Sequence, residues 1–253
     1  MANISGLLKW SYRRAINVVR RFSHSYADTA EKKVRDFSPR VPEYLNECPG
    51  RTFLVLGTGP MLGEYGDKIK LFIEKHNAIT IGGNHITPFI YPDYHAISNR
   101  NRFVTYAETF NPKRSKVLLS PYLPLRLVKE HYTGPYQEIM YLPDEERDFD
   151  IKEGVVLAGC RSIVLLGTAL AIVMGGTKIF IAGMDGYRNP NDYFTETTVK
   201  EKWDMEYRMQ FQEDCEKVIR QIGNYMCVRG LEGPTIITPT AYEEFYRDIN
   251  CYL

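Results

Sequence analysis

The chain has 253 residues, of which 44% are hydrophobic and 25% are charged, a composition typical of a globular protein with a sizeable core. Its formal net charge of only +1 gives no overall attraction to nucleic acid, so we expect no nucleic-acid partner. The five cysteines are scattered and contain no Cys-x-x-Cys pair, which indicates neither a zinc site nor a disulfide framework and fits a cytoplasmic protein.

The first 27 residues contain no acidic side chain but carry basic ones and apolar ones at helical spacing, which predicts a basic amphipathic helix. Such a helix either attaches the protein to the anionic inner face of a membrane or packs on the body of the protein or on another subunit. The sequence leaves both open, and a transit peptide has a similar composition. A connector follows, so we divide the chain into 1–50 and a domain over 51–253.

Short apolar stretches predict strands over 52–56, 78–81, 94–97, 116–119 and 178–182. Helical patterns cover 62–76, 163–174 and 203–222, and a short strand and a final helix near 241–248 close the chain. Residues 122–150 are expected to be irregular. The long apolar run over 163–184 is interrupted by Gly175 and Gly176, which favours a buried helix followed by a buried strand over a membrane span.

Strands that alternate with helices predict an α/β protein: a single Rossmann-like domain with a mostly parallel sheet and a helical lid at about 188–214. Ligands of such sheets bind beyond the carboxyl ends of the strands. The first strand runs into Gly57-Thr58-Gly59-Pro60 and then a helix, an arrangement that lets a phosphate approach backbone N–H groups. A third glycine and a Gly-Lys-Ser/Thr motif are both missing, so a plain tight turn explains this loop equally well.

Polar residues also follow the second and third predicted strands. Asn84 suits a sugar hydroxyl or a nucleobase, although Gly-Gly-Asn is equally good turn chemistry. His85 is a candidate general base, and a structural histidine is the alternative. Asn99, after the third strand, is a further candidate for ligand binding.

Two more candidate sites lie later in the chain. Arg161 and Ser162 open the apolar helix, where the helix dipole favours a carboxylate or phosphate, unless Ser162 is simply the N-cap. Asp185 ends a central strand, a common place for a catalytic or ribose-binding acid. Tyr187 and Tyr193 follow on the same loop, and both phenols are placed to donate hydrogen bonds to a leaving phosphate.

Together these motifs resemble the bacterial sialyltransferases of lipooligosaccharide synthesis and their relatives, among them the motility accessory factors that glycosylate flagellin and the archaeal pterin diphosphokinase-like domain. The shared features are a strand running into Gly-x-Gly-Pro, an Asn closing the second strand, a Ser-containing turn before an apolar helix, and a strand ending in Gly-x-Asp-x-Tyr. They occur in the same order from Phe53 to about Tyr193, and the spacing of the two tyrosines is the most specific match.

The resemblance implies a glycosyltransferase that uses a CMP-activated acidic sugar, sialic-acid-like or Kdo-like, to modify a surface glycan or glycolipid. It implies no cofactor and no metal ion. Residue by residue, it implies a nucleotide loop at Gly57, Gly59 and Pro60, donor contacts from Asn84, a sugar carboxylate near Ser162, and a departing CMP phosphate held by Tyr187 and Tyr193.

Two departures from the family's pattern leave the reaction open. Thr58 stands where the sialyltransferases have Asn, and no His follows His131, although their general base is a His in the lid. The lid region offers carboxylates instead, at Glu196, Glu201, Asp204 and Glu206. Two alternatives therefore stay open: an ATP-dependent diphosphokinase with Mg²⁺ on Asp185 and Asp192, and a non-catalytic nucleotide-sugar-binding domain.

Overall fold

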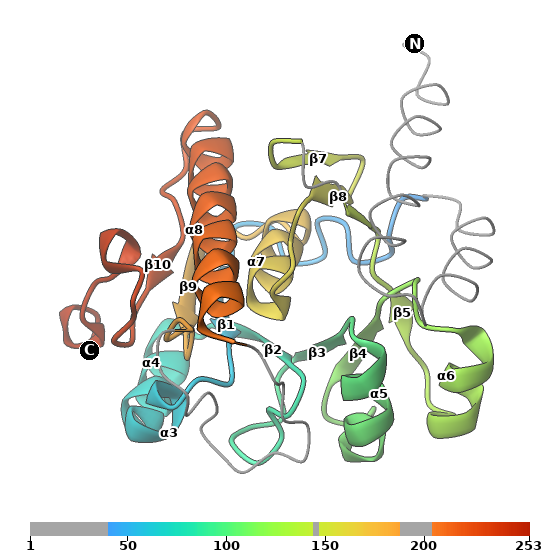
Figure 1. Ribbon diagram of the computed structural model, residues 1–253. Helices are drawn as coiled ribbons and strands as arrows, with labels where there is room; N and C mark the ends of the chain where they lie inside the picture. Colours follow the sequence, from blue (N-terminus) through green and yellow to red (C-terminus); the bar gives the residue numbers. More distant parts are fainter. Residues whose placement is uncertain (1–39, 144–146, 188–203) are drawn as a thin grey trace.

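A computed structural model describes residues 40–143, 147–187 and 204–253 (Figure 1). The predicted basic helix in 1–27 lies outside the described residues. So does the part of the predicted lid at 188–203, which contains Asp192, Tyr193, Glu196 and Glu201.

A seven-stranded sheet forms the centre of the structure, in the order β10-β9-β1-β2-β3-β4-β5. All six pairs of neighbouring strands are parallel, which confirms the predicted α/β, Rossmann-like fold. The strands are β1 (Thr52–Leu56), β2 (Ile79–Gly83), β3 (Tyr94–Ile97), β4 (Lys116–Leu119), β5 (Gln137–Glu138), β9 (Lys178–Ala182) and β10 (Thr235–Ile236).

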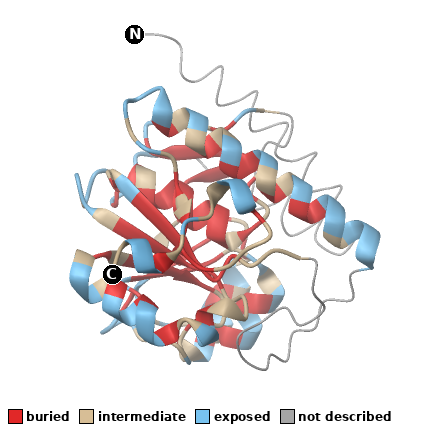
Figure 2. Ribbon diagram, turned by 90° about the vertical axis from the view of Figure 1, so that its left-hand side faces the viewer, coloured by how far each residue is buried: buried red, intermediate tan, exposed pale blue. Residues whose placement is uncertain are grey.

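Helices cover both faces of this sheet, because its central strands are apolar on both sides. Alternate residues of β1 point to opposite cores: Phe53 and Val55 pack in the core with α7 and α8, and Leu54 and Leu56 pack in the core with α4. In Figure 1, α7 (Ile163–Val173) and α8 (Met205–Cys227) lie above the strands. Below the strands lie α3 (Met61–Glu64), α4 (Gly66–His76), α5 (Arg100–Tyr106) and α6 (Leu125–His131). Figure 2 shows the buried strands between these two layers.

The predicted irregular stretch over 122–150 was wrong. It contains α6 and β5, and it then enters a second, three-stranded sheet of β6 (Tyr141–Pro143), β8 (Val155–Ala158) and β7 (Asp150–Lys152). Met140, Leu142, Val155 and Leu157 form a small core for this sheet. β5, β6 and β7 have only two or three residues, too few to display an alternating pattern in the sequence.

The remaining predicted elements differ in detail. The helix expected over 62–76 is divided into α3 and α4 at Tyr65, and the helix expected near 241–248 is reduced to short 3₁₀ turns over Glu243–Phe245 and Ile249–Cys251. The apolar run after residue 163 is a buried helix followed by β9, as predicted. Within residues 40–143, 147–187 and 204–253, no helix is both long and apolar enough to cross a bilayer.

Candidate ligand site at the carboxyl edge of the sheet

The chain changes direction across the sheet at β1. From β1 it continues through β2, β3, β4 and β5 to one side, whereas β9 and β10 are added on the other side. The connection after β1 leads to α3 and α4 below the sheet, and the connection after β9 leads towards α8 above it (Figure 1). Ligands of open α/β sheets bind at such a switch point, so the ends of β1 and β9 define the candidate site.

The loops after β1 and β9 are in direct contact. The backbone N–H of Gly57 donates to the carbonyl of Ala182 at 2.8 Å, and that of Gly59 donates to the carbonyl of Gly183 at 2.9 Å. A Cβ atom on Gly57 would lie only 2.3 Å from the Gly183 carbonyl oxygen. Gly57 is therefore required for the two loops to pack together, whatever ligand they bind.

Asp185 reaches from the loop after β9 to the start of α3. Its Oδ2 atom accepts a hydrogen bond from the backbone N–H of Met61 at 2.7 Å, while its Oδ1 atom is buried and has no hydrogen-bond partner among the described residues. Burial, helped by the negative charge of Glu64, raises the pKa of Asp185 to about 6, although the Met61 N–H opposes the shift. A Cβ atom on Gly59 would lie 2.5 Å from the Asp185 carboxyl carbon, so this contact also requires glycine.

A segment near the end of the sequence holds the loop that carries Asp185. The hydroxyl of Thr238 accepts from Gly183 N–H at 2.9 Å, and the hydroxyl of Thr240 donates to the Met184 carbonyl at 2.6 Å. The backbone N–H of Ala241 donates to the carbonyl of Asp185 at 2.8 Å. No sequence motif identifies these residues as part of the site. The only signal of their role in the sequence is a pair of threonines just after a short apolar stretch.

The amino terminus of α7 packs against the same edge. A Cβ on Gly57 would meet the Val164 side chain at 3.0 Å, and one on Gly83 would meet Ile163 at 2.5 Å, so the first turn of α7 lies on the ends of β1 and β2. Ser162 is the N-cap of α7, because its hydroxyl accepts from Val164 N–H at 3.3 Å. No acidic residue lies in this first turn, which leaves the positive end of an 11-residue helix at the switch point.

Arg161 connects α7 to α8. Its guanidinium forms an ion pair with Asp214 at 2.6 Å and donates to the Tyr207 hydroxyl at 2.7 Å. It also lies 5.0 Å from the centre of the Phe211 ring. These contacts fix Arg161 on the first three turns of α8, the described part of the predicted lid.

Tyr187 attaches the loop after β9 to the same part of α8. Its ring packs edge-on against Phe211 with 4.7 Å between ring centres, and its backbone N–H donates to the Gln212 side chain at 3.1 Å. Asp204, one of the predicted lid bases, is the N-cap of α8 and accepts from Tyr207 N–H at 2.8 Å. The carboxylate of Asp204 is therefore used to cap α8.

The next two strand ends carry the other predicted residues. Asn84 has a left-handed φ of 53°, and its carbonyl accepts from the ring of His95, a buried group whose pKa burial lowers to about 4. The ring of His85 stacks on Tyr106 at 4.6 Å, and its Nδ1 atom has no hydrogen-bond partner among the described residues.

The pKa of His85 is lowered by burial and by the charge of Arg102, so its imidazole is neutral at pH 7. Asn99 is the N-cap of α5, because its Oδ1 accepts from Arg102 N–H at 3.1 Å. The side chain of Asn99 therefore has a capping task, whereas His85 retains a neutral ring at the end of β2.

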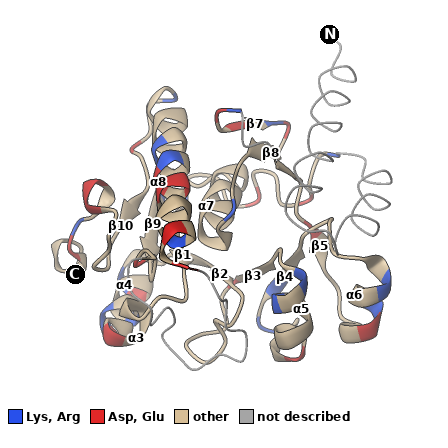
Figure 3. Cartoon of the chain, viewed as in Figure 1, with Lys and Arg blue, Asp and Glu red and all other residues tan. Residues whose placement is uncertain are grey.

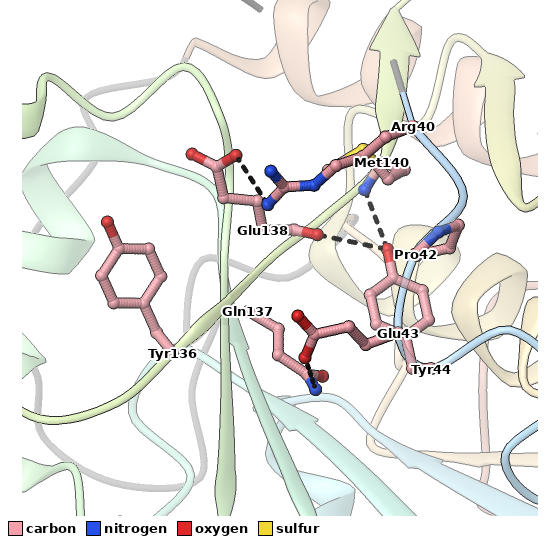
Figure 4. Close-up of a pocket in the computed structure, with 8 residues that line it drawn as sticks. All are labelled: Arg40, Pro42, Glu43, Tyr44, Tyr136, Gln137, Glu138 and Met140. Atoms are coloured by element: carbon pink, nitrogen blue, oxygen red, sulfur yellow. Dashed lines mark hydrogen bonds and ion pairs between the residues drawn. The ribbon is translucent and has the colours of Figure 1, made fainter. Parts of the chain in front are cut away.

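A separate cavity of about 320 Å³ lies beside β5, four strands away from β1 (Figure 4). Gln137 donates to Glu43 at 2.9 Å, Arg40 pairs with Glu138 at 3.7 Å, and the Tyr44 hydroxyl accepts from Met140 N–H at 2.8 Å. None of the residues predicted from the sequence lines this cavity. Its full lining is Arg40, Pro42, Glu43, Tyr44, Tyr136, Gln137, Glu138 and Met140.

Charged side chains of both signs lie on the outer helices α4, α6 and α8, and basic side chains lie on α5 (Figure 3). In the part of the chain that the structure describes, no group of three or more His, Cys, Asp or Glu side chains is arranged to hold a metal ion.

Of the residues predicted from the sequence, the structure brings together the loops after β1 and β9 and the start of α7, with Asn84 and His85 at the adjacent strand end.

No protein-family model and no curated protein matches the chain. Among solved structures, the chain is similar to the MAf glycosyltransferase from Magnetospirillum magneticum AMB-1, with a TM-score of 0.42 and 18% sequence identity over 72% of this chain. The match covers 33% of that protein, so this chain spans about a third of its length.

Proposed function

We propose that this chain is a glycosyltransferase that takes an acidic sugar from a CMP-activated donor and transfers it to a hydroxyl group of a surface glycan or glycolipid. One observation carries the proposal: the motifs that resemble the sialyltransferases come from four distant parts of the sequence and lie at one edge of the sheet. Gly57 and Asn84 directly follow β1 and β2, Ser162 is the N-cap of α7, and Tyr187 lies on the loop after β9.

Electrostatics supports an anionic donor at this edge. The start of α7 presents the positive end of a helix whose first turn has no acidic side chain, and it contacts the ends of β1 and β2. We place the phosphate or the sugar carboxylate of the donor there. The start of α3 is a poorer anion site, because the Asp185 carboxylate already accepts from its first N–H group.

In the proposed reaction, the acceptor oxygen forms a bond to the anomeric carbon of the sugar while the bond from that carbon to the CMP phosphate breaks. The proton of the acceptor hydroxyl passes to a general base, and CMP departs with the bonding electron pair. Tyr187, with Tyr193 from the adjoining segment, donates hydrogen bonds to the phosphate as its charge develops. His85 is the proposed base, because its imidazole is neutral at pH 7 and lies at the end of β2.

Isothermal titration with CMP, CDP, UMP and GMP tests the donor class, and hydrolysis of CMP-sugars tests the chemistry. We expect the cytidine nucleotides to bind and a CMP-sugar to be turned over. Binding of UMP or GMP but not of CMP or CDP would overturn the proposal. Transfer of diphosphate from ATP to a pterin would instead identify a diphosphokinase, and binding of CMP-sugars without turnover would identify a non-catalytic domain.

A further inference from the structure

We infer that the outer side of α5 and α6 binds an anionic membrane, and that the acceptor is therefore a glycolipid in that membrane. We call this surface the basic face, and its exposed members are Val104, Leu125, Arg126 and Lys129. Contact with a membrane needs no nucleotide, so only the identity of the acceptor rests on the proposed function.

Charge is distributed unevenly along the chain. Residues 100–131, which form α5, β4 and α6, contain seven Lys or Arg and only two Asp or Glu, a net charge of +5. The whole chain has a net charge of +1, so the other 221 residues together carry −4. Figure 3 shows the basic side chains on α5 and α6. An anionic surface attracts and orients a molecule whose charge is separated in this way.

Apolar side chains lie among these cations. Leu125 directly precedes Arg126 and is 47% exposed, and Val104 of α5 is 39% exposed. Their neighbours Phe103 and Val128 are buried in the core that the two helices share, so the exposed pair lies outside that core. At a membrane, such apolar groups enter the acyl boundary while the cations meet lipid headgroups. An anionic glycan in solution would gain nothing from them, which favours a membrane as the partner.

A second basic segment joins the structure beside this face. Residues 1–39 contain eight Lys or Arg and three Asp or Glu, and they lead into Arg40, which pairs with Glu138 of β5 at 3.7 Å. The next residue, Val41, is 60% exposed. Because α6 connects β4 to β5, this attachment point lies at the same end of the sheet as the basic face. Both segments therefore strengthen the attraction of one end of the molecule for an anionic surface.

The basic face also borders the edge of the sheet that carries the candidate site. α5 follows β3 and α6 follows β4, so both helices begin at the carboxyl edge of the parallel sheet. β4 lies three strands from β1, a distance of about 15 Å. The headgroup of a glycolipid with several sugar units spans that distance. Contact through α5 and α6 therefore presents the site to the headgroup layer, which favours a glycolipid acceptor over a soluble glycan.

Co-sedimentation of the full chain with vesicles tests the inference, with one set of phosphatidylcholine alone and one that also contains phosphatidylglycerol. We expect binding to the anionic vesicles only, and weaker binding at higher salt. The Arg126→Gln/Lys129→Gln double variant should lower the partition coefficient about thirtyfold, since each cation near an anionic surface contributes about fivefold. Leu125→Ser should lower it about fivefold, because a half-exposed leucine loses its burial in the membrane.

The matched control is the Lys178→Gln/Lys217→Gln double variant, which removes the same charge from exposed positions on β9 and α8. Because these two lysines lie away from the basic face, their loss should lower binding less than about twofold. All of the substituted side chains are exposed, so every variant should keep the wild-type melting temperature.

Equal binding to the two kinds of vesicle would overturn the inference, and so would unchanged binding of the Arg126→Gln/Lys129→Gln protein. An equal loss in the control would also overturn it, because net charge alone would then explain the effect. Self-association that the Arg126→Gln/Lys129→Gln protein loses would assign the face to a second copy of the chain instead. Failure of vesicle binding leaves the donor proposal intact if CMP still binds, whereas failure of CMP to bind, with the expected vesicle results, supports the membrane face and overturns the donor class alone.

Discussion

Replacing Gly59 by alanine should displace the Asp185 carboxylate, because the new Cβ would lie 2.5 to 2.8 Å from its carboxyl atoms. The side chain can swing away, but it then loses its 2.7 Å hydrogen bond from Met61 N–H. A hydrogen bond to a charged group contributes about 1.5–3 kcal/mol. For a chain of this size, that loss corresponds to a melting temperature lower by about 3–12 °C.

Thermal unfolding followed by circular dichroism measures this effect, with Gly223→Ala as the control. Gly223 lies in α8, and a Cβ there meets only Pro234 at an ordinary 3.9 Å, so alanine should stabilise the helix by up to about 1 kcal/mol. In an Asp185→Ala background, Gly59→Ala should cost far less, since the clash is gone. A neutral Gly59→Ala variant, or an equal loss in both backgrounds, would refute the contact as the reason for glycine.

Four further outcomes are expected. The raised pKa of Asp185 contributes stability that is present below about pH 4 and is lost as the pH rises through about 6. Chemical denaturation should therefore show the wild-type protein losing stability relative to Asp185→Asn across that range. Glu64→Gln should reduce this effect, because the negative charge of Glu64 helps to raise the pKa of Asp185. Tyr187→Phe keeps the ring contact with Phe211 and should keep the melting temperature, but it should lower kcat for CMP-sugar hydrolysis about a hundredfold, and near-normal turnover would remove Tyr187 from the reaction. Thr238→Val leaves the buried Gly183 N–H unpaired and should cost about 1–3 kcal/mol in urea unfolding, whereas a loss below about 0.5 kcal/mol would show that Thr238 does not hold this loop. Deleting residues 1–27 should leave nucleotide binding intact and reduce sedimentation with anionic liposomes, and unchanged sedimentation would refute membrane attachment by this segment.

The central strands and the long helices α4 and α8 could be predicted from the sequence, whereas β5, α6 and the second sheet could not. β1 and β9 are buried on both faces, so each is a continuous apolar run bounded by glycine or charged residues. β5 and α6 have mixed, partly exposed side chains, and their structure comes from tertiary contacts that the local pattern does not contain. The same holds for the second sheet, whose strands have only three or four residues.

The candidate site was predictable to the level of strand ends, but the tasks of individual side chains were not. The sequence predicts Asn99 after a strand and Ser162 at the start of a helix, and the structure uses both side chains as helix N-caps. The task of Gly57 depends on its contact with Gly183, 126 positions later, and no local motif contains such a contact. Asp185 was selected from its place at a strand end, whereas its bond to Met61 required the fold.

Thr238, Thr240 and Ala241 hydrogen-bond to the loop that carries Asp185, so this loop is completed late in synthesis. A ribosome adds these residues more than fifty positions after the loop that they hold. The first strands and α7 can associate while translation continues, but the loop after β9 gains its last three hydrogen bonds only when the segment at 238–241 has left the exit tunnel. A nascent chain arrested before that point should contain most of the sheet and still fail to retain a ligand at its edge.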